Sequence, residues 1–138
     1  MKLQNFKYEG SGLQRFFGPL ETRILEAIWE AQEPSTIKEV QDKLGRDKPM
    51  SFNTVMTVMN RLVDKGVLLK STAARSYRYR AVMSKEAFLE TQSKELTLDL
   101  VQEFGPLAVA HMVDAVEQVD PRLLDELERK IKQIKKDR

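Results

Sequence analysis

The chain has 138 residues, which is enough for one domain or for a small domain with an appendage. It contains no Cys and one His, so its composition excludes disulfides, thiolate metal sites, a Cys nucleophile and a standard zinc site. No apolar run approaches the roughly 18 residues of a membrane-spanning helix, and the N-terminus lacks the apolar core of a signal peptide. We therefore expect a cytoplasmic protein that inserts into no membrane and uses no metal or cofactor.

The net charge of +2 conceals an asymmetry between the two parts of the chain. Residues 1–82 hold fourteen basic and nine acidic residues, a net charge of +5, whereas residues 83–138 carry −3. Between Lys48 and Arg80 there are seven basic residues and one acidic residue, Asp64. This pattern indicates a surface that faces a polyanion such as nucleic acid, although solvated basic faces are also common.

The first part of the chain predicts an arm and two helices. Residues 1–17 show no clear period and are expected to form a loosely ordered N-terminal arm. Gly18-Pro19 opens a predicted helix over residues 19–32, because Pro suits a first turn and apolar residues follow with a 3.6 period. Ser35 or Thr36 is expected to cap a second, short helix, with Glu39 three residues after Thr36 as a capping box, and this helix ends at Gly45.

The segment from Ser51 to Gly66 predicts a third helix with an unusual polar face. Ser51 is the expected N-cap, and Gly66 is the expected stop. One side of the helix is apolar, and the other side carries short polar side chains that fit base edges rather than the Glu/Lys pairs of an ordinary solvated face. The first-turn residues could also serve the cap or a phosphate. The candidate base-reading residues are Asn53, Thr54, Thr57, Asn60 and Arg61. Asn60 could instead contact a phosphate or lie at the edge of the groove without a contact.

Two short strands are predicted after the third helix, over residues 67–72 and 77–82, with a tight connection at 73–76. Tyr77 and Tyr79 alternate with Arg side chains, and we expect both tyrosines to pack the hairpin onto the helices. Three helices and a hairpin predict a winged helix-turn-helix domain over residues 18–83, whose third helix enters the major groove. The predicted contacts to the DNA backbone come from Lys48, Ser51, Lys65, Lys70, Arg75 and Arg78.

Residues 84–138 predict further helices, so the fold class is mainly α. Their apolar stripes are too extensive for a solvated tail and too few for a core of their own. We therefore expect a helical dimerisation region, which would place two reading helices on successive turns of DNA. The candidate dimerisation residues are Leu100, Phe104, Leu107, Val113, Leu124, Leu127, Ile131 and Ile134.

The segments 52–66 and 75–81 resemble the penicillinase-repressor (BlaI/MecI/CopY) family, and a looser resemblance extends over residues 18–137. The resemblance implies a homodimeric transcriptional repressor that binds inverted-repeat operators of β-lactamase, methicillin-resistance or copper-transport genes. It also implies base reading by Thr54, Thr57 and Arg61, and a wing contact from Arg75 to the DNA backbone or minor groove.

Two features depart from the family's pattern. The copper-responsive branch has a C-terminal Cys-x-Cys motif, and this chain has no Cys, so metal-thiolate sensing is discarded. The staphylococcal branch is cut at an Asn–Phe bond in its C-terminal region, whereas the Asn-Phe pair here is Asn5-Phe6. Induction by proteolysis through a membrane sensor protease stays open, with the region near Phe104-Gly105 as a plausible cutting locus.

One alternative function belongs to another class of protein. The same fold could be a protein-interaction module without sequence-specific DNA binding, and exposed apolar residues on the third helix would favour it. Only Met56 suggests such a residue in the sequence. An enzyme is not expected, because the chain has no phosphate loop, no nucleophile elbow and no paired acid/base cluster.

Overall fold

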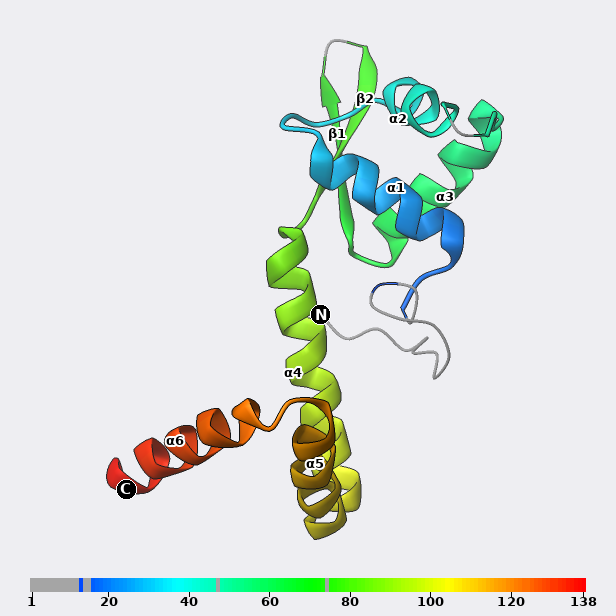
Figure 1. Cartoon of the computed structure of the whole chain (residues 1–138). Coiled ribbons are helices and arrows are strands. Elements are labelled where there is room, and N and C mark those ends of the chain that lie inside the picture. The colour runs from blue at the N-terminus through cyan, green and yellow to red at the C-terminus, as the bar shows by residue number, and fades with distance from the viewer. Residues whose placement is uncertain (1–12, 14–15, 47, 74) are drawn as a thin grey trace. The chain divides into compact units, whose positions relative to one another are not determined.

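The computed structural model describes residues 13, 16–46, 48–73 and 75–138, and Figure 1 shows the course of the chain. The chain divides into two compact units, Met1–Ser93 and Lys94–Arg138, and one helix runs through the division. The predicted mainly α fold, with a winged helix-turn-helix, is confirmed. The described elements are α1 (Pro19–Glu30), α2 (Ile37–Leu44), α3 (Phe52–Asp64), β1 (Leu68–Ala73), β2 (Ser76–Ala81), α4 (Lys85–Phe104), α5 (Pro106–Val119) and α6 (Arg122–Lys136).

Local hydrogen bonds explain where the first two helices begin. The Gly18 amide donates to Glu21 Oε1 at 3.0 Å at the start of α1, which is one half of a capping box, because glycine has no side chain to supply the other half. At the start of α2, Thr36 Oγ1 accepts from the Glu39 amide at 3.1 Å, and Glu39 Oε1 accepts from the Thr36 amide at 3.2 Å. Helix α1 ends two residues earlier than predicted, because the backbone at Ala31 is already extended, with ψ of 136°.

Helix α3 begins and ends where its sequence predicts. Ser51 Oγ accepts a hydrogen bond from the Thr54 amide at 3.1 Å, so Ser51 is the N-cap. After Asp64 the chain turns at Gly66, whose φ of 79° lies in the left-handed region that glycine adopts without a Cβ clash. The amide of Val67 returns to the Leu62 carbonyl at 3.0 Å, and the chain then enters the hairpin.

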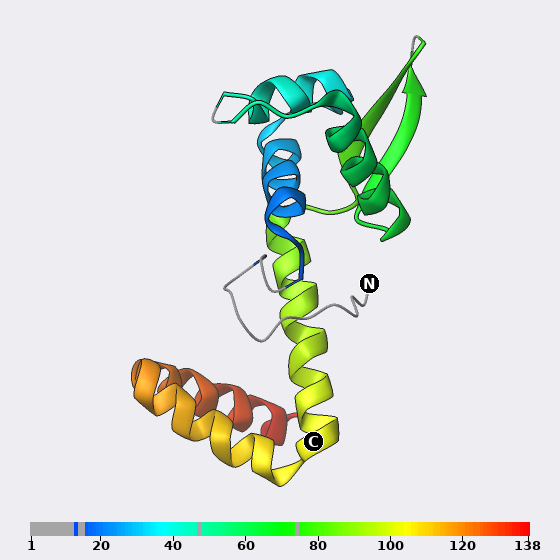
Figure 2. The same cartoon turned by 90° about the vertical axis from the view of Figure 1, so that its right-hand side faces the viewer.

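Strands β1 and β2 form an antiparallel hairpin in which Ala73 pairs with Ser76. The Tyr79 amide donates to the Ser35 carbonyl at 2.8 Å, and the Ser35 amide donates to the Tyr79 carbonyl at 2.9 Å, which joins β2 to the segment before α2. Figures 1 and 2 show the hairpin alongside the three helices of this unit.

One apolar core holds the first unit together, and it includes the beginning of α4. Phe88 is fully buried, and its ring centroid lies 5.5 Å from that of Phe17 and 6.0 Å from that of Trp29. Trp29 Nε1 also donates to the Met83 carbonyl at 3.0 Å. The domain boundary at residue 83 stays a prediction, but the core extends beyond it. The predicted arm, residues 1–17, lies mostly outside the described residues. Two of its described residues, Leu13 and Phe17, are buried.

The second unit contains the end of α4, α5 and α6, and α5 contacts α6. Helix α6 begins at Arg122, and Asp120 Oδ1 accepts from the Arg122 amide at 3.1 Å. No residue of α5 or α6 is buried, so the apolar stripes of both helices remain largely exposed in the single chain. In the part of the chain that the structure describes, no helix is long and apolar enough to cross a membrane.

Candidate nucleic-acid interface

The outer face of α3 presents polar side chains to solvent. Asn53, Thr54, Thr57 and Arg61 are all exposed, whereas the opposite face of the helix is buried in the core. Through their side chains, Thr57 and Arg61 make no hydrogen bond or ion pair with any described residue. These two side chains are therefore available to a ligand, and a guanidinium can bond to both acceptors of a guanine edge.

The first turn of α3 is partly occupied by its own cap. The hydroxyl oxygens of Ser51 and Thr54 lie 2.8 Å apart, and both residues are exposed. Thr54 therefore contributes to the cap, while its neighbour Asn53 makes no side-chain bond to a described residue. The free amides of a first helical turn also attract phosphate, so this end of α3 suits an anion as well as a base.

Asn60, on the third turn of α3, interacts with the hairpin. Its Oδ1 accepts from the Tyr79 hydroxyl at 3.0 Å and from Lys70 Nζ at 3.3 Å. Tyr79 is fully buried, as predicted, but Tyr77 is 54% exposed, so the prediction that both tyrosines pack onto the helices is wrong for Tyr77. Tyr77 lies closer to the hairpin tip, where its ring instead lies under the Lys70 ammonium, 4.0 Å from the centroid.

Lys65 binds a carboxylate inside the protein. Its Nζ lies 2.9 Å from Glu21 Oε2, and it also lies 5.6 Å from the Phe17 ring centroid. Burial raises the pKa of Glu21, but bonds from Lys65 and the Gly18 amide, with the charges of Lys65 and Arg61, outweigh it and lower that pKa overall. This pair joins the end of α3 to the first turn of α1, and the phosphate contact of Lys65 stays a prediction.

The wing and the loop before α3 supply further cations. Arg75 is exposed at the hairpin tip. Among the described residues other than glycine, Arg75 is the one with a positive φ, which is 74°. Arg78 is half-buried, and its Nη1 lies 3.4 Å from Glu39 Oε1 and 3.5 Å from the Pro34 carbonyl oxygen. Lys48, in the loop before α3, is exposed. Arg75 therefore places an exposed cation at the tip of the wing, and Arg80 places another towards its base.

Sequence reasoning missed one exposed residue of α3. Phe52 opens the helix and is 43% exposed, although Phe is among the more apolar side chains. At 100° per residue it lies about 60° from Val55, beside rather than within the buried stripe, and this angle could have revealed it. Met56, the residue expected to be exposed, instead packs partly against the core.

A three-helix core, a two-stranded wing and an exposed polar face on the third helix define a winged helix-turn-helix protein. Residues 17–133 match the model of the penicillinase repressor family. The chain therefore belongs to the penicillinase repressor family, and the resemblance found in the sequence is confirmed.

Individual relatives match shorter stretches. Two proteins described as "Transcriptional regulator BlaI", from Mycobacterium tuberculosis strains CDC 1551 / Oshkosh and ATCC 25618 / H37Rv, are each 32% identical over 69 residues. Each match covers 50% of this chain, and the chain spans about half the length of the curated relatives it matches.

Among solved structures, Bordetella bronchiseptica BpsR matches with a TM-score of 0.46 and 16% identity, over 75% of this chain and 76% of that chain. A MarR/EmrR family regulator from Acinetobacter sp. ADP1 matches with a TM-score of 0.45 and 20% identity, over 88% of this chain and 81% of that chain.

Proposed function

We propose that this chain is a sequence-specific DNA-binding transcriptional repressor that acts as a homodimer on an inverted-repeat operator. The observation that carries the proposal is the exposed face of α3, where Thr57 and Arg61 are free to bind, beside a wing that ends in Arg75. Membership of the penicillinase repressor family supports it and favours a regulator over an enzyme.

Specificity and affinity come from different residues in this proposal. Thr57, Arg61 and Asn53 on α3 read base edges, because this helix is the one that a winged helix-turn-helix inserts into the major groove. The exposed cations Lys48, Lys70 and Arg75 neutralise phosphates and release counterions, which supplies affinity for any sequence.

The second unit supports the homodimer. An apolar groove of about 480 Å³ lies on it, lined by Leu100 and Phe104 of α4 and by Leu107, Ala108, His111 and Met112 of α5. Leu107 is 61% exposed and Ile134 of α6 is 57% exposed, which is costly for a chain that stays single. A two-fold dimer that buries these side chains removes that cost.

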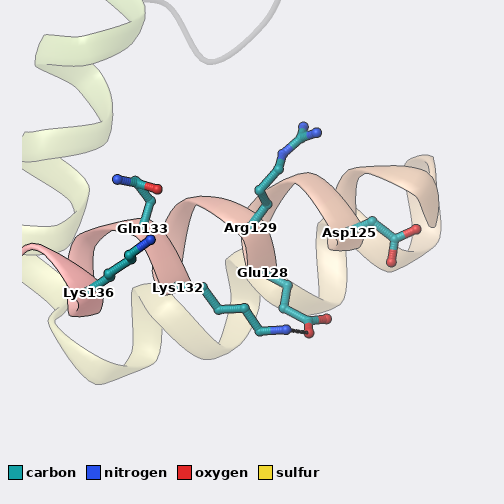
Figure 3. Close-up of a pocket in the computed structure, with 6 residues that line it drawn as sticks. All are labelled: Asp125, Glu128, Arg129, Lys132, Gln133 and Lys136. Carbon is teal, nitrogen blue, oxygen red and sulfur yellow. Dashed lines mark ion pairs between the residues drawn. The ribbon is translucent and has the colours of Figure 1, made fainter.

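The charged face of α6 is built differently from its apolar stripe. A hollow of about 400 Å³ lies along this face, lined by Asp125, Glu128, Arg129, Lys132, Gln133 and Lys136. Figure 3 shows these six side chains on α6. Lys132 Nζ and Glu128 Oε1 pair there at 2.8 Å. A face of solvated ion pairs suits water, so the apolar stripe of α6 is the face that we assign to the second copy.

The proposal also covers the regulated genes and the signal that releases the repressor from DNA. Control of β-lactamase-type or other resistance genes, with release by a membrane sensor protease, rests on the family. One local feature favours cleavage between α4 and α5, where Gly105 has a φ of 53° and Phe104 is 48% exposed. Co-expression with the candidate sensor and mass spectrometry of the products would locate the cut bond or show that none is cut.

Footprinting on the DNA upstream of the chain's own gene tests the central proposal. Protection of two half-sites about one helical turn apart is expected. Arg61→Ala should then cost about 1–3 kcal/mol on that site and nothing on unrelated DNA. Lys94→Ala, which removes an exposed charge from α4, is the matched control and should bind as the wild type does. Unchanged operator affinity of Arg61→Ala would remove α3 as the reading helix.

The exposed Phe52 favours the alternative function, a docking module for another protein. The two functions differ in one measurement, because a docking module shows no preference for the upstream DNA over unrelated duplex in a gel shift. An equal affinity for the two DNAs at moderate salt would support the docking module and exclude the repressor.

A further inference from the structure

The hydrogen bonds around Asn60 point to a contact of a different kind from base reading. We infer that Asn60 is a donor-only ligand for a DNA phosphate, and that Tyr79 and Lys70 of the wing fix its orientation. This inference rests on the proposed function, because it assigns a role to one residue of the same DNA-binding surface. It assigns no adenine contact to Asn60.

The orientation of the Asn60 amide follows from the chemistry of its neighbours. An ammonium group carries three donors and no acceptor, so the amide atom that faces Lys70 Nζ at 3.3 Å must be the oxygen. The Tyr79 hydroxyl reaches the same oxygen at 3.0 Å. Because the Tyr79 ring is fully buried and its backbone pairs with Ser35, the hydroxyl has a fixed position.

This orientation limits what the amide can bind. Pairing of Asn with adenine needs both amide atoms, since the oxygen accepts from adenine N6 while the nitrogen donates to N7. The Asn60 oxygen already accepts from two residues, whereas its nitrogen has no acceptor within the described part of the chain, and the residue is part-exposed. Asn60 therefore offers two N–H donors to a ligand and no acceptor.

The surroundings of Asn60 favour a phosphate as the acceptor. The Lys70 ammonium lies beside the amide and attracts an anion to the same place. Asn60 also bonds to Lys70 of β1 and to Tyr79 of β2, so its amide lies on the side of α3 that faces the hairpin. Phosphate oxygens are pure acceptors, which matches a group that can only donate.

The variant Asn60→Asp tests this inference because Asp has nearly the same shape. One carboxylate oxygen can still accept from Tyr79 and Lys70, while the second replaces the donating nitrogen with a negative charge. We expect the midpoint of thermal unfolding to stay within a few degrees of the wild type. DNA affinity should fall by at least about tenfold on the operator and on unrelated duplex alike. An unchanged affinity would overturn the inference.

A chemical scan of the operator separates the two possible acceptors. Methylphosphonate at one backbone position should weaken the wild type and leave Asn60→Ala unaffected, because the contact to that phosphate is already lost. The competing outcome uses 7-deazaadenine, which lacks N7. If one such base weakens the wild type and not Asn60→Ala, Asn60 reads adenine and the inference is wrong.

The variant Tyr79→Phe tests the positioning role of the wing. It removes a buried hydroxyl without opening a cavity, and it leaves the Asn60 oxygen with Lys70 alone. The effect of the same methylphosphonate should shrink in this variant, a readout that a merely structural tyrosine would not change. If wild-type protein binds no DNA, the proposed function fails as well. If the wild type binds the operator and Tyr79→Phe keeps the full methylphosphonate effect, only the positioning role fails.

Discussion

Glu21 and Lys65 show how charged side chains near the proposed DNA-binding surface can stabilise the fold instead of binding a ligand. Glu21 is 7% exposed, and its two oxygens accept from the Gly18 amide and from Lys65 Nζ. Removing one of the two donors from a buried carboxylate costs free energy, because an acceptor is then left without a partner away from water. The pair therefore stabilises the contact between α1 and the end of α3, which is the helix that we assign to DNA.

Stability should depend on pH through Glu21. Because its folded pKa lies below the value in the unfolded chain, the stabilisation is present above the unfolded pKa, near 4.5. It is lost as pH falls through the folded pKa. Glu21→Gln should lower the free energy of unfolding by about 1–3 kcal/mol at pH 7. In acid, the difference in free energy of unfolding between the variant and the wild type should become smaller. Urea titrations at pH 7 and pH 3 measure both effects, with Glu90→Gln on the exposed side of α4 as control.

Lys70 should act on all DNA sequences equally. Lys70→Ala removes the ammonium that lies between Asn60 and Tyr77, and with it one phosphate contact. We expect binding to the operator and to unrelated duplex to weaken by a similar factor. The slope of the logarithm of the binding constant against the logarithm of salt concentration should become shallower by about one unit. Titrations by fluorescence anisotropy at several salt concentrations test this. A loss confined to the operator would instead make Lys70 a reader of bases.

At the scale of the element, the wing carries a conformational cost at its tip. A non-glycine residue in the left-handed region costs about 1 kcal/mol or more, and Arg75 occupies that region with φ of 74°. Glycine would adopt this turn more readily, whereas Arg places a positive charge at the tip of the wing.

Arg75→Gly should separate stability from binding. We expect the free energy of unfolding to rise by up to about 1 kcal/mol, because the left-handed turn no longer carries a Cβ, while DNA affinity falls. Chemical denaturation and gel shifts measure the two quantities. Arg75→Lys is the matched control, since it keeps both the Cβ and the charge. Lower stability of Arg75→Gly would contradict this account of the turn.

The elements of the winged helix were predictable because their signals are local. Ser51, Thr36 and Gly66 bond or turn within a few residues of their own positions, and the structure has each of them where the sequence predicts. The exposed candidates Thr57 and Arg61 follow from helical periodicity in the same way.

The contacts that no local pattern encodes were the ones that sequence reasoning could not supply. Asn60 meets Tyr79 across 19 positions, and Lys65 meets Glu21 across 44, so both pairs depend on tertiary packing. The exposure of Tyr77 could not be predicted for the same reason. Strand alternation predicts on which face of the hairpin the side chain lies, but not how far the helices extend beneath that face.

At the scale of the whole molecule, exposed apolar residues of the second unit make oligomeric state the decisive property. Ile131→Glu places a charge in the apolar stripe of α6, where the wild-type side chain is 43% exposed. We expect the variant to sediment as a monomer and to lose most of its operator affinity, because one reading helix replaces two. Lys136→Glu, on the charged face that Figure 3 shows, is the matched control. A dimeric Ile131→Glu would place the dimer interface elsewhere.

The contact between Trp29 and α4 gives the protein a natural optical reporter. Trp29 is the single tryptophan of the chain, and its indole both donates to the Met83 carbonyl and packs near the Phe88 ring. Its fluorescence should therefore change when the first turns of α4 separate from α1. Emission spectra recorded during a DNA titration would follow that event without a dye, a tag or a substitution.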